Sequence, residues 1–478
     1  MATSQLLRIV SENLTVQYPP EPSQLQQSAA LISVGGTTLT TGTYQYCASL
    51  SAVQAILSSA GNYAELTNMA TTFFAQGSLQ GVYVLELGTQ TTPQTGIAAL
   101  QTWITANPKV FYAYDVPADW DTMPAPSAPA VTVTADSTST LPAGTFYTQI
   151  AYSNSSGTIG QLSAVVTSDV STSDADSLVV TSPSALTGAT NYLVYMGTSS
   201  SALYLQNGSS GTAIGTNYTQ AAPISTTTGT STTLADLGNQ LGGNTAKTYF
   251  CVNSSVTNVA SYGVMGADSV WTGYKSIIAV VPSPTAQSGE FTSAAWLYNV
   301  VVNNPGPANK LAPLQYRFLF GVTPWPATGY SASIQTIANY GGNWVGTGAE
   351  GGISQNCLFK GTTSSLVQIS EWYGIDWAGI NTDQAIANAV INGSNSNPPL
   401  EYDQHGINFL AEVAQQKIDD AVTFGCLQSG VISAVPFATY YAQSPGDYPD
   451  GIYNGLSCNA VGQAGFLNLV FNLNVSGL

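Results

Sequence analysis

The sequence predicts a mixed α/β (α+β) core that is interrupted by an all-β sandwich and flanked at both ends by extended β-arms. Helix-type and strand-type apolar patterns alternate over residues 28–120 and resume after residue 245. Between Pro124 and about Gly242 the chain has no Lys, Arg or His, and Ser, Thr and Gly dominate. The change in composition indicates that a separate module is inserted into the α/β part.

The α/β part is predicted from apolar residues whose spacing switches between strand and helix. Residues 29–34 are mostly apolar and end at Gly35-Gly36, which is typical of a strand followed by a turn. From about Leu50 the spacing becomes helical, and Gly61 is placed to cap that helix. Further helical faces are expected at 66–73, 97–104 and 291–298, and further strands at 82–85, 110–114, 249–252 and 277–281.

The inserted segment begins after a Pro-rich linker at 123–129 and has the short, closely spaced strands of a β-sandwich. Parts of it, 141–147, 152–157 and 162–164, resemble fibronectin-III or immunoglobulin-like modules. That resemblance implies a fold and leaves open whether the module is a spacer or binds a glycan or cell surface. Strands are expected at 131–133, 146–152, 162–166, 178–180, 192–195 and 203–205.

The chain has very few charges for its size. Only 7% of its 478 residues are charged, against roughly 25% in an average soluble protein. Charged residues are depleted from the cores of protein interfaces, so we expect copies of the chain to cover one another. The net charge of −17 argues against binding a phosphate backbone, and nucleic acid is not an expected partner.

The residues that usually carry catalysis are scarce. His405 is the single histidine, which removes most routes to imidazole acid–base or metal chemistry, and we expect neither an enzyme nor a cofactor. Near it, Asp403 is interpreted as a helix cap, and Asp419-Asp420 as a polar helix face. Five cysteines lie in no metal-binding spacing; we expect buried thiols and leave disulfides between subunits open: Cys47, Cys251, Cys357, Cys426 and Cys458.

The sequence shows no targeting or membrane segment. Residues 2–18 alternate polar with apolar instead of forming a signal peptide, so synthesis and assembly in the cytoplasm are expected. No run of about 18 apolar residues occurs, so no direct membrane insertion is expected. Gly-rich stretches such as 346–352 lack the Lys-Ser/Thr of a phosphate loop and are interpreted as turns.

The two ends of the chain have strand-like alternation. Residues 14–18 alternate apolar with polar and stop at Pro19-Pro20, and residues 467–475 give a strand with a strongly apolar face. Such a strand can add to its own sheet or to an exposed sheet edge of another subunit. The residues proposed for intersubunit arms are Leu7, Ile9, Leu14, Val16, Tyr18, Leu467, Leu469, Phe471, Leu473 and Val475.

Several runs in fixed order resemble the contractile tail sheath proteins of bacteriophages. They are 314–324, 338–343, the Gly-rich 346–352, the helix at 372–391, and 399–407 with the helix that follows it to Gly425. The α/β pattern of 28–120, including Phe73-Phe74-Ala-Gln76, fits the same family. This chain departs from the family in carrying fewer Lys and Arg and in the inserted module.

The resemblance implies a subunit that polymerises helically around a tail tube and contracts, with baseplate and tail terminator proteins as further partners and the virion tail as its location. Terminal arms would then join neighbouring subunits, and Arg317 and Lys417 are candidates for intersubunit ion pairs. The expected organisation is an N-terminal arm at 1–20, α/β segments at 21–123 and 243–330, the insertion at 124–242, a C-terminal α/β domain at 331–463 and a C-terminal arm at 464–478.

Two other classes of function remain open at this point. A secreted or surface-exposed adhesin, or a surface-layer protein, would explain the acidity and the Ser/Thr-rich module, but would carry a secretion signal. A glycan-cleaving enzyme would need two carboxylates about 5 to 10 Å apart in a cleft, a spacing in space that the sequence does not show.

Overall fold

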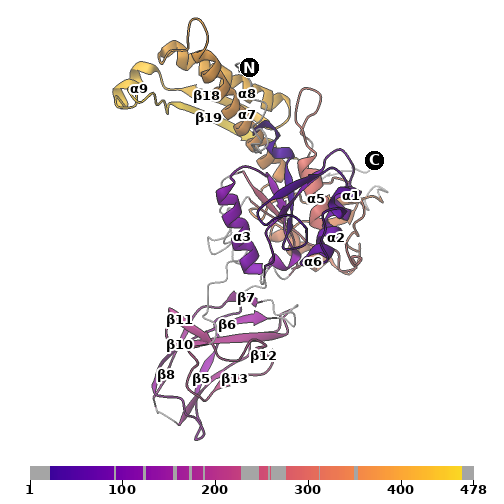
Figure 1. Cartoon of the computed structure of the whole chain (residues 1–478), viewed down its shortest axis with the longest axis vertical. Coiled ribbons are helices and arrows are strands. Elements are labelled where there is room, and N and C mark those ends of the chain that lie inside the picture. The colour runs from indigo at the N-terminus through magenta and orange to yellow at the C-terminus, as the bar shows by residue number, and fades with distance from the viewer. Residues whose placement is uncertain are drawn as a thin grey trace, which may run out of the picture.

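The computed structural model has three parts along its longest axis (Figure 1). An α/β core lies in the middle, a β-rich unit lies at one end, and a helical unit with a two-stranded sheet lies at the other. The structure describes residues 22–90, 93–121, 125–153, 159–171, 175–186, 189–227, 247–256, 259, 276–311, 313–348 and 354–465. All ten proposed arm residues lie outside these ranges, so the arms stay a prediction.

The core is built on a six-stranded sheet with the order β15-β14-β4-β1-β3-β2. Its strands are parallel except β2, which runs antiparallel to β3 at one edge. Because β4 and β14 pair directly, the chain leaves this sheet for the β-rich unit and then returns to it. The strands are β1 Ala29–Ser33, β2 Tyr44–Cys47, β3 Val82–Glu86, β4 Ala113–Asp115, β14 Tyr249–Asn253 and β15 Ile277–Val280.

Alternate residues of the sheet belong to two apolar clusters, one on each face. In β1, Leu31 belongs to the first cluster and Ile32 to the second. Helices α1 (Leu50–Gln54), α2 (Tyr63–Ala75) and α5 (Thr292–Val301) cover the first face. Helices α3 (Pro93–Ala106) and α6 (Ser331–Asn339) cover the second. Burial on both faces explains why these strands are almost continuously apolar.

A buried polar cluster ties the sheet to the C-terminal helices. The hydroxyl groups of Tyr112 and Tyr249 both donate to Oδ2 of Asp376, at 3.1 and 2.7 Å. Next to β4, the hydroxyl group of Ser293 donates to Asp115 at 2.6 Å, and burial raises the pKa of the Asp115 carboxyl well above its usual value. Buried polar groups of this kind are costly unless paired, so they fix how α5 and the C-terminal helices sit on the sheet.

The β-rich unit contains two sheets that share one apolar cluster. A sheet of order β11-β10-β6-β7, with β8 on β6 and β12 on β10, packs on a sheet of order β13-β9-β5 through residues such as Phe146, Leu178 and Tyr192. The expected strand at 162–166 is wrong: β7 ends at Leu162 and β8 begins at Val166. The strands are β5 Val131–Ala135, β6 Gly144–Ser153, β7 Ile159–Leu162, β8 Val166–Val170, β9 Asp176–Val180, β10 Asn191–Ser199, β11 Ala202–Leu205, β12 Thr212–Ala213 and β13 Tyr218–Gln220.

Two other expectations about the core need correction. The helix expected from Leu50 to Gly61 ends at Gln54, because residues 56–58 form backbone hydrogen bonds or a β-bridge with residues 36–38. The strand expected at 110–114 is shorter and begins later, because β4 covers only Ala113–Asp115. Short 3-10 helices lie at Pro22–Gln27 and Ala118–Trp120.

The C-terminal unit consists of two long helices and a hairpin of strands. Helix α7 (Ile369–Ser394) packs its first part into the core, and its residues after Ile380 are all at least partly exposed. Helix α8 (Gln404–Thr423) lies against it, followed by β18 (Leu427–Ala434), α9 (Phe437–Gln443) and β19 (Leu456–Gly462). A small hairpin, β16 (Trp344–Thr347) and β17 (Asn356–Phe359), precedes the unit and packs on the core.

Candidate functional site

The two strands of the C-terminal hairpin form a sheet of their own, and one edge of it is open. Strands β18 and β19 pair antiparallel, with Val431 opposite Asn459 and Ile432 opposite Cys458. The side chain of Gln415 in α8 occupies the outer edge of β18: its amide oxygen accepts from Ile432 N–H at 2.8 Å, and its amide nitrogen donates to Gly430 C=O at 3.2 Å.

This arrangement sets which backbone groups of β19 point outward. Because Ile432 turns its N–H away from β19, its partner Cys458 turns its own N–H and C=O away from β18, and Ala460 does the same. Among the described residues, no segment pairs with this outer edge of β19. Neither strand contains a charged residue or a proline, the usual protections of a free edge. β19 is thus open to another strand.

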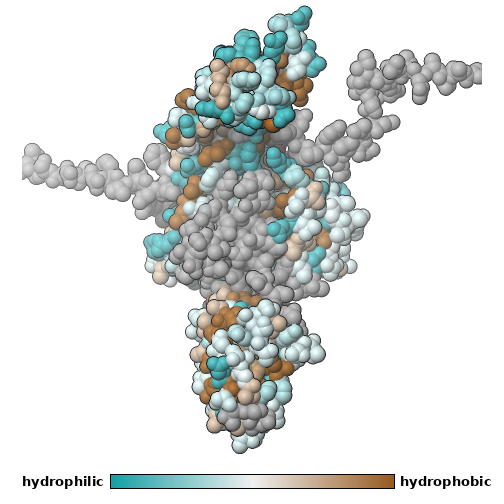
Figure 2. Space-filling view, turned by 90° about the vertical axis from the view of Figure 1, so that its left-hand side faces the viewer, coloured by the Kyte–Doolittle hydropathy of each residue, from teal (hydrophilic) through white to brown (hydrophobic). Residues whose placement is uncertain are grey.

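Strand β18 packs one face on α8, whereas its other face and all of β19 are at least partly exposed. Gly430 faces α8 so closely that a Cβ there would collide with Ile418, which explains the glycine. Val431 and Val461 face outward and are 61% and 52% exposed. In the space-filling view, hydrophobic residues stand among hydrophilic ones on the surface of the C-terminal unit (Figure 2). An isolated two-stranded sheet is marginal in water, so α8 is its main support.

The segment that connects β18 to β19 contains α9, which lies at the far end of the molecule (Figure 1), and its aromatic residues contact one another and Tyr402, which precedes α8. Tyr402, Phe437 and Tyr448 contact one another at ring-centroid distances of 5.1 to 5.8 Å. Hydrogen bonds fix the turn: Tyr440 donates to Asp447 at 2.5 Å, which raises the pKa of Tyr440, and Tyr402 donates to the Ile452 carbonyl at 2.6 Å. We call Asp447, Tyr448, Asp450 and Ile452 the acidic tip.

Arg317, predicted as an intersubunit cation, lies in a surface groove. The groove has a volume of about 460 Å³ and is lined by Gln76, Leu79, Tyr298, Arg317, Phe318 and Phe320 among others. Arg317 is half-buried, and no carboxylate of the described residues pairs with it. We call this the Arg317 groove.

Local contacts hold the walls of the Arg317 groove in place. The side-chain amide of Gln76 accepts from Phe320 N–H at 2.9 Å and donates to its carbonyl at 2.6 Å. Gly77, at φ +156°, lets the Tyr298 hydroxyl approach to 2.5 Å from where a Cβ would stand. Within the part of the chain that the structure describes, Phe318 forms an isolated β-bridge with Cys357. Phe318 and Phe320 stay about half exposed, so the groove has an apolar rim.

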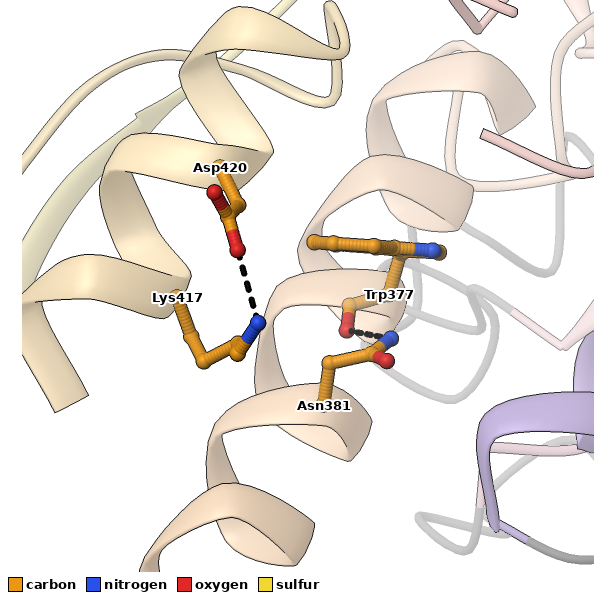
Figure 3. A network of polar contacts seen from close by, with 4 residues as sticks. All are labelled: Trp377, Asn381, Lys417 and Asp420. Atoms are coloured by element: carbon orange, nitrogen blue, oxygen red, sulfur yellow. Dashed lines mark hydrogen bonds and ion pairs between the residues drawn. The ribbon is translucent and has the colours of Figure 1, made fainter. Parts of the chain in front are cut away.

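Lys417, the other predicted intersubunit cation, has a partner within the chain. Its Nζ lies 2.7 Å from Oδ2 of Asp420, one helical turn away in α8. The lysine side chain extends toward α7, where Trp377 and Asn381 lie (Figure 3). An ion pair that is only partly buried and spans one helical turn contributes little to stability.

The remaining candidate residues have structural surroundings. Asp403 accepts from Gly406 N–H at 2.8 Å and caps α8, which confirms its interpretation as a helix cap. Cys458 is exposed and the other four cysteines are buried. Within the described residues no group of three or more His, Cys, Asp or Glu could hold a metal ion. A search of the same residues finds no helix with the length and apolarity of a membrane span.

Sequence reasoning missed the β18–β19 sheet and the acidic tip. The signal for the tip was present: Phe437, Tyr440, Tyr441, Tyr448 and Tyr453 fall within a short stretch beside two aspartates. The signal for the sheet was weak, since β18 and β19 contain many small and polar residues.

The chain thus combines a helix-covered parallel sheet with two surfaces suited to contact other chains. No protein-family model and no curated protein matches it. Among the solved structures that are similar to it, two with low scores are the following. A chain of the anti-feeding prophage baseplate matches with a TM-score of 0.35 and 11% identity over 50% of this chain and 72% of that one. The sheath tail protein Lin1278 from Listeria innocua matches with a TM-score of 0.34 and 13% identity over 85% and 88%.

Proposed function

We propose that this chain is a structural subunit of a contractile tail sheath, which polymerises helically around a tail tube and shortens to drive the tube through a host envelope. The observation that carries the proposal is the open outer edge of β19, an edge without charge or proline. The order of sequence runs over 314–425 and the scarcity of charge support the same function.

The open edge gives the terminal arms a place to bind. Residues 14–18 and 467–475 alternate apolar with polar, as a strand does that covers one apolar face. A strand from a neighbouring subunit that added to β19 would satisfy the outward N–H and C=O groups of Cys458 and Ala460. Its apolar face would cover the exposed side chains of the sheet, and that face would fix the register.

A strand added to β19 would hold two subunits together through backbone hydrogen bonds, while the chain next to it could bend as a hinge. Both properties suit an assembly that contracts. The compact cores would change neighbours while the added strands keep the subunits connected. A free-energy difference between two packings, summed over many copies, would supply the work, so no bound nucleotide is required. The proposed partners are other copies of the chain, the tail tube protein, and baseplate and tail terminator proteins, in the virion tail.

We also propose a revised division of the chain. Ile337 and Trp344 share an apolar cluster with Ile32, so residues 331–348 and 354–359 go with the core, and the C-terminal unit begins near Ile369 instead of at residue 331. The β-rich unit is proposed to be an immunoglobulin or fibronectin-III-like decoration. It lies at the end of the molecule away from β19, where it would not interfere with strand addition (Figure 1).

The test is negative-stain electron microscopy of the purified full chain, with a variant that blocks the β19 edge. We expect hollow striated tubes from the unmodified chain. Cys458→Pro removes an outward N–H without removing a hydrogen bond to β18, so it should abolish tubes while circular dichroism shows a folded chain.

Cys458→Ala is the matched control, because it keeps the N–H, and it should form normal tubes. Tubes of normal yield from Cys458→Pro would show that β19 does not take up a strand. Dispersed monomers of the unmodified chain at high concentration would contradict the sheath function itself.

A further inference from the structure

We propose that the acidic tip of one copy docks in the Arg317 groove of a second copy, with an ion pair between Asp450 and Arg317 at its centre. The inference deepens the proposed function and rests on it only in requiring that the chain associate with itself. It concerns a different surface from the β19 edge, and it names the residues on both sides of the contact.

The Arg317 groove combines exposed apolar side chains with a cation that lacks a carboxylate partner among the described residues, as expected of a surface that binds another chain. Its apolar rim includes Leu79, which is 87% exposed, together with Phe318 and Phe320. Arg317 is the only arginine in the described residues and has no carboxylate partner among them. Arginine and aromatic side chains are enriched where interfaces are energetically important, and a half-buried cation gains most when a carboxylate reaches it.

The acidic tip offers what the groove lacks. Tyr448 and Ile452 are 45% and 43% exposed, and Asp450 between them is exposed and has no hydrogen bond or ion pair with any residue that the structure describes. The turn is held by the Tyr440–Asp447 and Tyr402–Ile452 hydrogen bonds. A turn fixed in this way loses little conformational entropy on binding.

Charge divides unevenly between the two stretches of the chain that carry these surfaces. Residues 369–465, which include the tip, contain ten Asp or Glu and one Lys, giving a net charge of −9. Residues 302–368, which include Arg317, contain three Lys or Arg and one Glu, giving +2. In a chain with a net charge of −17, this is a marked local excess of positive charge. Complementary potentials of this kind orient two copies and disfavour other arrangements.

The tip and groove of one chain do not meet each other. The groove is lined by residues of α5 and of the loop after α2, in the core, whereas the tip lies beyond α9 at the end of the C-terminal unit (Figure 1). A contact between different surfaces of two copies is heterologous. It leaves a free tip and a free groove at the two ends, so it extends into a ring or a helical filament.

The first test is a charge swap in the full chain, with assembly measured as the concentration at which half the protein sediments. Arg317→Glu and Asp450→Arg should each raise that concentration at least about tenfold, because each leaves two like charges facing each other. The double variant should return it to within about threefold of the unmodified chain. Lys109→Glu and Glu412→Arg are matched controls at exposed positions outside both surfaces and should change it little.

The outcomes separate the inference from the proposed function. If the unmodified chain assembles and Arg317→Glu behaves like Lys109→Glu, the groove is not an interface, although the sheath function stands. If the single variants fail and the double variant is not restored, the Asp450–Arg317 pairing is wrong. Circular dichroism of each variant excludes misfolding as the cause of a loss.

A second measurement remains decisive even if the unmodified chain forms no tubes. In a Cys458→Ser background, which removes the exposed thiol, chains carrying Arg317→Cys are mixed with chains carrying Asp450→Cys and oxidised. A covalent dimer formed only by the mixture supports the docking. A mixture of Lys109→Cys and Asp450→Cys chains is the control, and equal dimer yield from both mixtures would overturn the proposal.

Discussion

The α/β core and the C-terminal unit both contain helices and strands, but they differ in how fully these elements bury their apolar residues. All five residues of β1 and all ten of α5 are buried. In the C-terminal unit, β19 has no buried residue, and Ile391 and Val431 are 62% and 61% exposed. Most apolar residues of the core are covered by its own chain, apart from those at the rim of the Arg317 groove, whereas the C-terminal unit displays apolar groups that other copies can cover.

The two regions therefore contribute differently to the stability of the single chain and to its assembly. Side chains in the core contribute to the free energy of unfolding of the single chain. Exposed apolar side chains of the C-terminal unit contribute little to it and become important when copies associate. Substitutions of one residue type in the two regions should therefore have separable effects.

A matched pair of phenylalanines gives the largest expected contrast. Phe73 in α2 is fully buried, with its ring 5.1 Å from that of Tyr298, and Phe73→Ala should lower the free energy of unfolding by about 3–5 kcal/mol. Phe409 in α8 is 40% exposed, and Phe409→Ala should change the free energy of unfolding by less than about 1 kcal/mol. Urea unfolding of dilute monomer measures both. Equal losses would show that the C-terminal unit is as self-sufficient as the core.

A smaller effect is expected at the protected edge of β18. Gln415→Ala removes the hydrogen bonds to Ile432 N–H and Gly430 C=O and should cost about 1–2 kcal/mol. Amide exchange at Ile432 should become faster at the same time. Gln416→Ala, at the exposed neighbouring position, is the control and should leave exchange unchanged. Unchanged exchange in Gln415→Ala would mean that α8 does not hold the strand through this side chain.

The smallest effect is expected at the start of α8. Asp403→Ala removes the cap on Gly406 N–H and should lower the free energy of unfolding by about 1 kcal/mol. Asp403→Asn keeps an acceptor oxygen and should retain most of that stability. If Asn and Ala variants melt alike, the cap contributes less than its geometry suggests.

The core could be predicted from sequence because its elements carry their own pattern. Continuous apolar runs gave β1, β3, β14 and β15, and helical spacing gave α2, α3 and α5 within a few residues. The helix from Leu50 was predicted too long because the pairing of residues 56–58 with 36–38 is not local to that segment. Long-range pairing of this kind overrides local propensity.

The candidate surfaces were harder to predict, since exposure is a property of the folded chain. Arg317 was selected as a cation, yet its place among Leu79, Phe318 and Tyr298 depends on residues far apart in sequence. Lys417 was selected for the same reason, and in the structure it pairs with Asp420 of the same helix. This local pair accounts for the position of the lysine without a second subunit. The open edge of β19 follows from the position of Gln415, which no periodic pattern reveals.

The direct pairing of β4 with β14 has a consequence for how the chain folds during synthesis. Parallel neighbours need a crossover connection, and here the β-rich unit lies within that crossover where a helix is usual. Part of the second face of the core sheet is covered instead by α6 and Trp344, which are synthesised much later than β4. More than two hundred residues are synthesised between β4 and α6, and during that time this face of the sheet is partly uncovered. Exposed apolar surface of this kind is prone to aggregation, so this is the stage at which the growing chain would need chaperones most.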